Sequence, residues 1–291
     1  MRIKTKINEK GLLKLAVLAV LSVFFISCSV ERRLAKEFVE ETKKPPVVLK
    51  KPQKFYMVSY RETDKDTAGL KSWQIDSLRF YESKYLQHLS QEKLVNNFNS
   101  AFYNELERLG FDTYQGKEVA PLIGKDTVNP IIISFPQMEM NEYVELLRES
   151  EYVGNRRYFK NFELNAIDLS TWLKLTRHNN DQQKVFFMND SITDYVDGFF
   201  YRNRKSGRVK YRYEEHTLEK GDIYRFMKDM GRNYAQYVYD YYLNRFIDIN
   251  RDNPGPREFL YHYDPVDQQI ILIREMPWTE METEQSGKKN Q

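Results

Sequence analysis

Cysteine is almost absent from this chain, which contains a single one, Cys28, among 291 residues. One thiol cannot form an internal disulfide, so covalent cross-links cannot stabilise the fold, and a hydrophobic core has to do so. A zinc site built from several cysteines is excluded for the same reason. The position of the only cysteine is therefore informative in itself.

Histidine is also scarce, and no two of the four histidines have the spacing of a metal-binding HxxxH or HExxH motif. They are His88, His178, His216 and His262. Residues 214–216 (Glu-Glu-His) together with Glu219 could bind a cation, but solvated charge ahead of a helix explains them equally simply. We expect no metal site.

Motifs that cradle phosphate or activate a nucleophile are missing too. The chain has only 12 glycines, none in a Gly-x-Gly or Walker pattern. It has no GxSxG elbow, and no SxxK motif in a suitable context. A pair of carboxylates for glycoside hydrolysis depends on geometry that a sequence does not reveal. We therefore expect no enzyme and no cofactor.

Long apolar runs are limited to one, Leu15 to Ile26, which is broken only by Ser22. It is shorter than the roughly 20 apolar residues of a transmembrane helix. A basic segment precedes it, and a small residue, Ser27, follows it. This pattern predicts a signal peptide over residues 1–27. The alternatives are an uncleaved signal anchor and ordinary cleavage that leaves Cys28 free.

The four residues at the end of this run, Phe25-Ile26-Ser27-Cys28, resemble the lipobox that signal peptidase II cleaves in bacterial lipoproteins. The resemblance implies that Cys28 becomes the new N-terminus and carries a thioether-linked diacylglycerol and an amide-linked acyl chain. Several acyl chains form a stable membrane anchor, whereas one chain alone is marginal. The implied location is the outer membrane, where the lipid would hold the protein on the periplasmic face.

Removal of residues 1–27 also changes the charge balance. It leaves 40 basic against 41 acidic residues, compared with 45 against 42 in the whole chain. Nucleic-acid binding depends on an excess of basic charge that displaces counterions, so we expect no nucleic-acid partner.

The remaining chain divides into three parts by composition. Residues 28–54 mix charges of both signs with prolines and predict the lipidated cysteine followed by a flexible tether. The near-helical spacing of Leu34, Phe38 and Val39 would also allow a short helix over Glu31 to Glu41 within it. Residues 55–276 are expected to form a single α+β domain. Residues 277–291 are polar and aperiodic, which predicts a disordered tail.

Apolar periodicity predicts two dominant helical segments in the domain. One runs from Ser72 to Leu109, as one helix or as two in series with a break near Ser90, and Gly110 closes it. The other runs from Glu219 to Ile249, with Gly231 as a weak point.

Strands are predicted at residues 55–60, 131–133, 138–146, 162–175 and 184–195, with hairpins at 199–213 and 259–273. A change of parity in the apolar residues predicts a β-bulge near Ala166 and Ile167.

Tyrosine is frequent, with 21 residues, and clusters in the C-terminal third. A helix with tyrosines on several faces cannot bury all of them, which predicts an interaction surface, unless they pack inside a wide α/β interface. The candidate residues are Tyr237, Tyr241, Tyr242, Tyr261 and Tyr263.

The order of elements predicts an α+β fold, an antiparallel sheet with two long helices packed on one face. This order is similar to that of small envelope-assembly lipoproteins. The likeness implies a non-catalytic subunit or scaffold that works in an envelope protein complex through protein–protein contacts. A surface protein that binds or degrades glycans is the alternative. Tripeptides such as Asp76-Ser77-Leu78 and Asp190-Ser191-Ile192 resemble acceptors of a bacterial O-glycosylation system.

Overall fold

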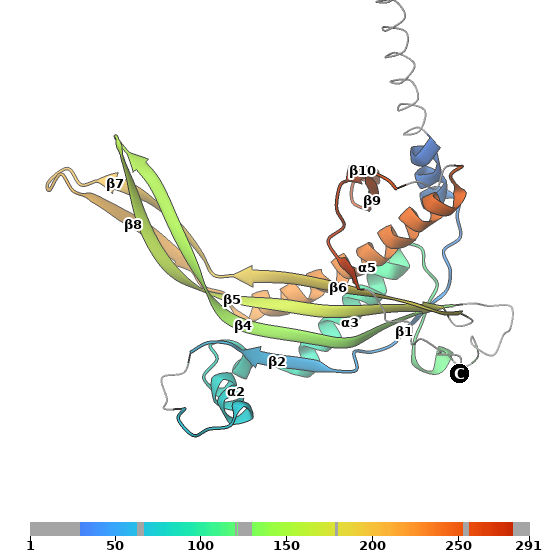
Figure 1. Cartoon of the computed structure of the whole chain (residues 1–291), viewed down its shortest axis with the longest axis horizontal. Coiled ribbons are helices and arrows are strands. Elements are labelled where there is room, and N and C mark those ends of the chain that lie inside the picture. Colours follow the sequence, from blue (N-terminus) through green and yellow to red (C-terminus); the bar gives the residue numbers. More distant parts are fainter. Residues whose placement is uncertain are drawn as a thin grey trace, which may run out of the picture. The chain divides into compact units, whose positions relative to one another are not determined.

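The computed structural model describes residues 30–62, 67–119, 121, 130–177, 180–252 and 256–281, and helices and strands are mixed in it (Figure 1). The predicted signal peptide and Cys28 lie outside these residues. The described residues form two compact units. The small unit contains residues 30–44 and 236–276, and the large unit contains residues 45–235 and 277–281. Residues 55–276, which the sequence predicts to form a single domain, contribute to both units.

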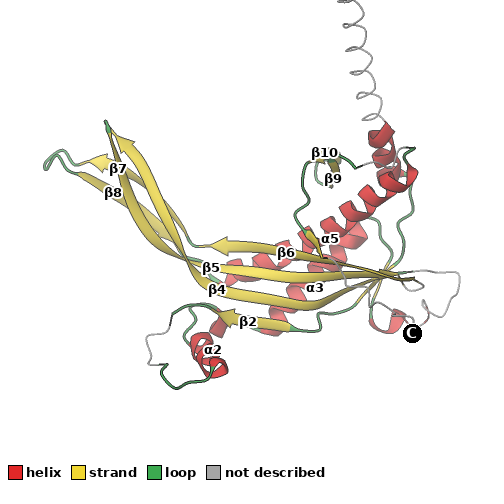
Figure 2. Ribbon diagram, viewed as in Figure 1, coloured by secondary structure: helices red, strands yellow, loops and turns green. Residues whose placement is uncertain are grey.

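The main sheet belongs to the large unit and has the strand order β11-β6-β5-β4-β1-β3, with β2 paired to β4 beside that path (Figure 2). Its strands are β1 (Val47–Leu49), β2 (Phe55–Ser59), β3 (Thr113–Tyr114), β4 (Ile131–Val153), β5 (Arg156–Arg177), β6 (Asn180–Thr193) and β11 (Thr279–Met281). Neighbours among β4, β5, β6 and β11 run antiparallel, as predicted. The prediction fails for β1, β2 and β3, which pair in parallel. Parallel neighbours need a crossover connection, and helical segments lie between β2 and β4.

A change of register occurs in β4 between Ser134 and Gln137. Pro136 lies inside this irregularity, and proline, which has no N–H to donate to the ladder, is tolerated in a sheet at such bulges. The pairing of β5 continues without a shift through Ala166 and Ile167 on both sides. The predicted bulge at those residues is therefore wrong. Ala166 and Ile167 point to opposite faces of the sheet, and both are fully buried. The face of β5 that is buried therefore changes at these residues without an extra residue in the ladder.

Of the two predicted alternatives for the helical segment after β2, the divided one is observed: α2 (Ser72–Tyr81), the short 3₁₀ helix η1 (Leu86–His88) and α3 (Gln91–Arg108). Ser90 is the N-cap of α3, and its hydroxyl accepts the Lys93 N–H at 3.3 Å. Gly110 follows the C-cap with a φ of 86°, a conformation that favours glycine. The 3₁₀ helix η2 (Gly116–Glu118) comes next.

The core of the large unit is built around Phe135 of β4. Phe98 and Phe102 of α3 meet its ring edge-on at 5.1 and 5.2 Å. Tyr234 of α5 (Lys220–Asn250) meets Phe98 at 5.7 Å. Where α5 approaches α3, a Cβ added to Gly231 would lie 2.4 Å from the Phe98 carbonyl oxygen. Gly231 is thus the point of close helix approach, and not simply a weak position in the helix.

The small unit combines a helical segment at residues 30–40, the part of α5 from Gln236 onward, and the hairpin of β9 (Leu260–Asp264) and β10 (Gln269–Ile273). Phe38 contacts the rings of Tyr239 and Phe246 at 5.3 and 5.5 Å. The flexible tether predicted for residues 28–54 is therefore wrong for the part that the structure describes. Phe38 and Val47 are buried, because even a short apolar set forms structure when other elements cover it.

The predicted disordered tail also needs correction. Thr279–Met281 form β11 and pair with Val185 to Phe187 of β6. Just before β11, the Trp278 ring packs edge-on against Phe186 at 6.0 Å. One aromatic residue and backbone pairing to an open strand suffice to order this segment. The rest of the predicted tail, residues 282–291, lies outside the described residues.

Candidate functional site

The feature of the large unit that stands apart from its core is a pair of hairpins, which we call the arm. It consists of the far ends of β4 and β5, residues 144–164, and of the hairpin of β7 (Tyr195–Arg202) and β8 (Val209–His216). Figure 1 shows both hairpins running to the same side, at the left of the view. The hairpin predicted for residues 199–213 is confirmed.

Aromatic side chains hold the two hairpins of the arm together. Phe162 of β5 contacts the rings of Tyr211 and Tyr213 of β8 at 5.5 and 5.0 Å. Tyr158 contacts Phe200 at 6.2 Å. Between these layers, a Cβ on Gly198 would lie 2.7 Å from the Tyr211 hydroxyl, so the ring occupies the space that a side chain would need. The arm is therefore a two-layer structure with its own aromatic interior.

The outer face of each hairpin is exposed and apolar in part. Directly paired residues point to the same side of a sheet, and successive residues of one strand point to opposite sides. Residues that point outward therefore alternate along each strand with those of the aromatic interior. On the β4–β5 hairpin the outward side chains include Leu146, Tyr152 and Phe159, which are 74%, 68% and 47% exposed. On the β7–β8 hairpin they include Tyr195 and Phe199, at 58% and 54%.

Basic groups lie against several of these exposed rings. The Arg148 guanidinium is 4.0 Å from the centre of the Phe159 ring, and that of Arg157 is 5.2 Å from the same ring. Arg157 also donates to the Ser150 hydroxyl at 2.8 Å. Across β7 and β8, Phe199 pairs with Arg212. Such cation–π contacts hold the charged groups in position beside the rings.

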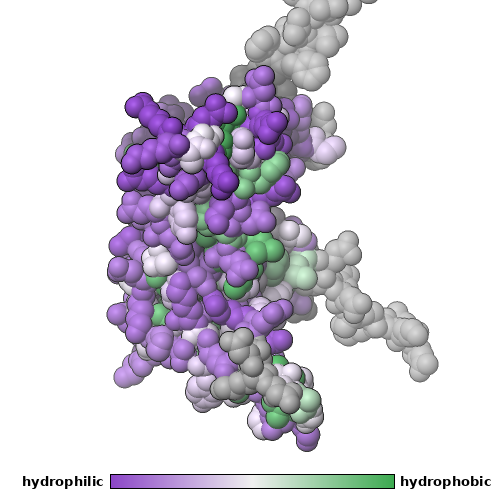
Figure 3. Space-filling view, turned by 90° about the vertical axis from the view of Figure 1, so that its left-hand side faces the viewer, coloured by the Kyte–Doolittle hydropathy of each residue, from purple (hydrophilic) through white to green (hydrophobic). Residues whose placement is uncertain are grey.

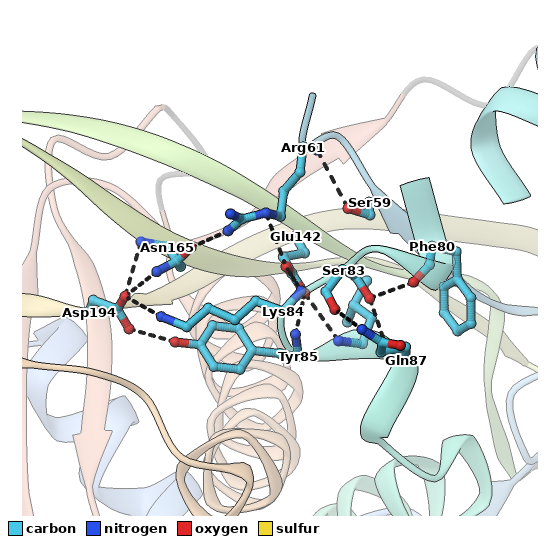
Figure 4. A network of polar contacts seen from close by, with 11 residues as sticks. Ser59, Arg61, Phe80, Ser83, Lys84, Tyr85, Gln87, Glu142, Asn165 and Asp194 are labelled. Atoms are coloured by element: carbon cyan, nitrogen blue, oxygen red, sulfur yellow. Dashed lines mark hydrogen bonds and ion pairs between the residues drawn. The ribbon is translucent and has the colours of Figure 1, made fainter. Parts of the chain in front are cut away.

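Two buried carboxylates lie where the arm leaves the body of the sheet (Figure 4). Glu142 of β4 is fully buried and accepts the backbone N–H groups of Lys84, Tyr85 and Leu86 at 2.6, 2.9 and 3.0 Å. It thus caps the start of η1, where a negative charge is favourable. The Arg61 guanidinium lies 3.8 Å from the carboxylate and partly compensates its charge.

Asp194 is the second buried carboxylate and lies between β6 and β7. It accepts the Tyr85 hydroxyl and the Leu218 N–H, both at 2.8 Å, and the Asn165 N–H at 3.2 Å. The Lys84 amine is 3.4 Å away. Burial acts to raise the pKa of Asp194, but the hydrogen bonds from Asn165, Leu218 and Tyr85 outweigh it, so its pKa is lowered.

The same environment raises the pKa of Tyr85, through burial and through its bond to Asp194. Both carboxylates are thus held by protein donors and shielded from solvent. A catalytic carboxylate has to reach a substrate, so this arrangement suits a structural role. The two carboxylates connect the η1 segment, the sheet and the chain before α5 at the base of the arm.

The tyrosines predicted to form an interaction surface do not do so. Tyr242 and Tyr261 are buried, and Tyr237, Tyr241 and Tyr263 are only partly exposed. The physical reason is that residues 30–40 and the β9–β10 hairpin pack in the same unit as this part of α5, so that tyrosines on several faces find cover. Exposed aromatic side chains lie instead on the arm, among them Tyr152 and Phe159, and on α2, which carries Trp73 and Tyr81.

A polar row on α5 holds the β9–β10 hairpin. Asn244 donates to the Tyr261 carbonyl at 2.7 Å and accepts its N–H at 2.9 Å, as a neighbouring strand would. Asp240 is buried and accepts the Tyr263 N–H at 3.1 Å and the His262 Nδ1–H at 2.6 Å. The bond to Asp240 raises the pKa of His262, and burial raises the pKa of Asp240.

The cation site considered for residues 214–216 and Glu219 does not form. Glu214 and Glu215 are successive residues of β8 and point to opposite faces, while the His216 ring stacks on Tyr195 at 4.4 Å. Among the described residues no group of three or more His, Cys, Asp or Glu is placed to hold a metal ion. In the same part of the chain, no helix is both long and apolar enough to cross a membrane.

Comparisons with known proteins give no family. No protein-family model matches the chain, and no curated protein matches it.

Proposed function

We propose that this chain is a membrane-anchored lipoprotein that serves as a non-catalytic subunit in envelope assembly or transport. The observation that carries the proposal is the arm, which displays Leu146, Tyr152, Phe159, Tyr195 and Phe199 to solvent. Exposed aromatic side chains in a group are typical of binding surfaces. The lipobox-like residues Phe25 to Cys28 support the anchor, with the outer membrane and its periplasmic face as the location.

The half of the arm nearest the sheet suits a protein partner. A shallow hollow there is lined by apolar side chains that include Leu146 and Tyr213, and by the charged residues Lys160, Glu163 and Glu215. Apolar side chains beside charges of both signs favour a partner segment that combines an apolar side chain with charged groups of complementary sign. Leu146 is central to this surface because it is the most exposed apolar residue of the arm.

We also infer that α3 and the first part of α5 cover one face of the sheet, as the order of elements predicts. The contact of Phe98 with Phe135 of β4 supports this placement of α3. The ring of Tyr234 of α5 lies 5.7 Å from that of Phe98, which supports the placement of α5 on the same side. The opposite face carries the polar residues Asn141, Ser170 and Asn189, of which Asn189 is exposed and the other two are buried.

The anchor is tested by metabolic labelling with a fatty acid, followed by membrane fractionation. The wild-type chain should incorporate label and sediment with membranes, and Cys28→Ala should do neither, because the only thiol is lost. An unlabelled wild-type protein, or a Cys28→Ala protein that sediments equally, would refute the lipoprotein assignment.

The protein contact is tested by affinity purification of the lipidated protein after chemical cross-linking. We expect a stoichiometric partner that is lost in Leu146→Asp but kept in Val266→Asp, a matched control. Val266 is 84% exposed and lies in the turn between β9 and β10. Absence of any stoichiometric partner from the wild-type sample, or equal recovery with Leu146→Asp, would refute the subunit role. Protease treatment of intact cells separates this role from a surface glycan-binding function, since a periplasm-facing protein is spared.

A further inference from the structure

The arm is divided by charge into two halves. The distal half, residues 148–160 and 199–212, contains ten Arg or Lys residues and only two Glu. The proximal half, residues 144–147, 161–164, 195–198 and 213–216, contains five Asp or Glu and neither Arg nor Lys. The near-neutral charge of the predicted mature chain therefore conceals a strongly basic end. Figure 3 views the molecule from the side on which the arm's turns lie, and hydrophilic side chains dominate that view.

Basic groups continue around the turn between β7 and β8. Arg204 and Lys205 are exposed there, and the Asn203 side chain accepts the N–H groups of Lys205 and Ser206 at 2.9 and 3.1 Å. The turn is thus shaped by Asn203 and the backbone, and the two charged side chains are not needed for its conformation.

Exposed rings accompany these charges on both sides of the arm. Tyr152 and Phe159 lie on the outer face of one hairpin, and Phe199 and Tyr201 lie on the outer face of the other. An aromatic ring with a neighbouring guanidinium or amine suits the region of lipid headgroups, where one end of the side chain is in an apolar and the other in an aqueous environment.

We propose that the distal half of the arm binds the surface of an anionic phospholipid bilayer, with the turns of the two hairpins approaching first. The separation of charge gives the arm its orientation, because the basic end is attracted and the acidic half is repelled. Contact by the turns lets the rings on both outer faces enter the headgroup region together. The inference builds on the proposed function, to which it adds a second membrane contact independent of the lipid at Cys28.

A linear polyanion fits less well, because a chain such as RNA would follow one outer face and leave the rings of the other unused. A second copy of the protein could place its acidic half against the basic half, and the measurements below separate that arrangement from binding to vesicles.

The test measures co-sedimentation of the mature chain from residue 28, carrying Cys28→Ser, with vesicles. One set contains only phosphatidylcholine, and the other contains one third phosphatidylglycerol. We expect binding to the anionic set alone and release at high salt, because the Debye length falls from about 10 Å at 0.1 M to about 3 Å at 1 M. Each basic residue near an anionic surface contributes roughly fivefold, so Arg204→Ala with Lys205→Ala should lower partitioning about thirtyfold.

The matched control removes the same charge from α5, outside the distal half of the arm. Lys220 and Lys228 are exposed residues of α5, and their joint replacement by Ala should change partitioning less than about twofold, since screening limits charge effects to short range. Equal losses in the two double variants would overturn the proposal, because they would indicate a nonspecific effect of net charge.

The missing thiol supplies a second measurement. In the Cys28→Ser background, Tyr152→Cys places the only thiol on the distal half, and Lys228→Cys places it on the control helix. An environment-sensitive fluorophore should shift to shorter wavelength with anionic vesicles at residue 152 and remain unchanged at residue 228.

No vesicle binding, binding of equal strength to both vesicle sets, or tighter binding to a single-stranded RNA oligonucleotide than to anionic vesicles would each overturn the proposal. So would a dimer whose formation is abolished by the Arg204 and Lys205 changes while vesicles are not bound. All of these measurements lack the lipid anchor, so their failure leaves the lipoprotein assignment standing, and failure of fatty-acid labelling leaves these results unaffected.

Discussion

Because α5 approaches α3 closely at Gly231, we predict that Gly231→Ala destabilises the protein, whereas helix propensity alone predicts that it stabilises it. Replacing a helical glycine by alanine ordinarily stabilises a helix by up to about 1 kcal/mol. At Gly231 the added Cβ would lie 2.4 Å from the Phe98 carbonyl oxygen and 3.0 Å from the Phe102 nitrogen. Both are backbone atoms, which cannot move aside as a flexible side chain can.

The helices would have to separate by roughly 1 Å, which loses a quarter to a half of the attractive energy of the atoms in contact. Phe98 and Tyr234 are fully buried at this crossing, so the loss falls on the core. Overpacking typically costs about 1–3 kcal/mol. Because the clash is with backbone atoms, we expect a cost at the upper end of this range, about 3 kcal/mol. After the gain of about 1 kcal/mol in helix propensity, Gly231→Ala should lower the free energy of unfolding by about 2 kcal/mol.

Urea unfolding followed by tryptophan fluorescence measures this change in the relevant unit, because Trp73, Trp172 and Trp278 all belong to the large unit. At a slope of about 2 kcal/mol per molar, the midpoint should fall by about 1 M. Gly221→Ala is the matched control in the same helix, where an added Cβ meets no atom within 4 Å. It should be neutral or stabilising by up to about 1 kcal/mol. If Gly231→Ala stabilised the protein as well, the inferred helix contact would be wrong.

Three further predictions concern buried polar groups and the arm. Asp194→Asn should destabilise the large unit by about 2–4 kcal/mol at neutral pH, because one acceptor oxygen is replaced by an amide that faces donors. Since the folded pKa of Asp194 is lowered, its contribution is complete above the ordinary value of 3.8 and is lost as the pH falls through the folded value. Urea midpoints of the variant should therefore fall less than those of the wild type below about pH 4, and an equal fall would contradict the argument. For His262 the sign is reversed: its folded pKa is raised, so its contribution is complete below the ordinary value of 6.5 and is lost as the pH rises through the folded value. An NMR titration of the His262 ring should give a midpoint above 6.5, and Asp240→Asn should lower that midpoint. A wild-type midpoint at or below 6.5 would refute the hydrogen bond to Asp240 as its determinant. Gly198→Ala should loosen the arm, because its Cβ would lie 2.7 Å from the Arg212 carbonyl oxygen. Amide hydrogen exchange in β7 and β8 should accelerate, while exchange in α3 should not change. Unchanged exchange in β7 would argue against the packing inferred for the arm.

Signals that act over a few residues were read correctly from the sequence. The break before Ser90, the glycine after α3 and the two hairpins at 199–213 and 259–273 all depend on local cap and turn chemistry. The predictions were wrong where packing against other parts of the chain decides whether a segment forms a helix or strand. Val47 and Val48 lie among prolines and lysines, and only pairing with β3 and β4 makes them a buried strand.

The arm shows a second limit of the same kind. Aromatic and basic residues are both frequent along 148–160 and 199–212, and this composition was the available signal. Its meaning depends on two hairpins, about 40 residues apart, that lie together and point their turns to one side. The tyrosines of α5 show the opposite error, because their high local density predicted an interaction surface, whereas they pack mostly in the interior. Periodicity identifies the faces of an element, but not the number of neighbours that cover them.

The irregularity at Pro136 has a consequence for how this protein can change in length during evolution. Loss of one residue between Gln137 and Val144 would exchange the inward and outward positions of β4, sending Met138, Met140 and Glu142 to solvent. Loss of residues in pairs at the turn between β4 and β5 would only shorten the arm. Homologues should therefore vary in reach by even numbers of residues while keeping the spacing from the proline to the buried glutamate constant.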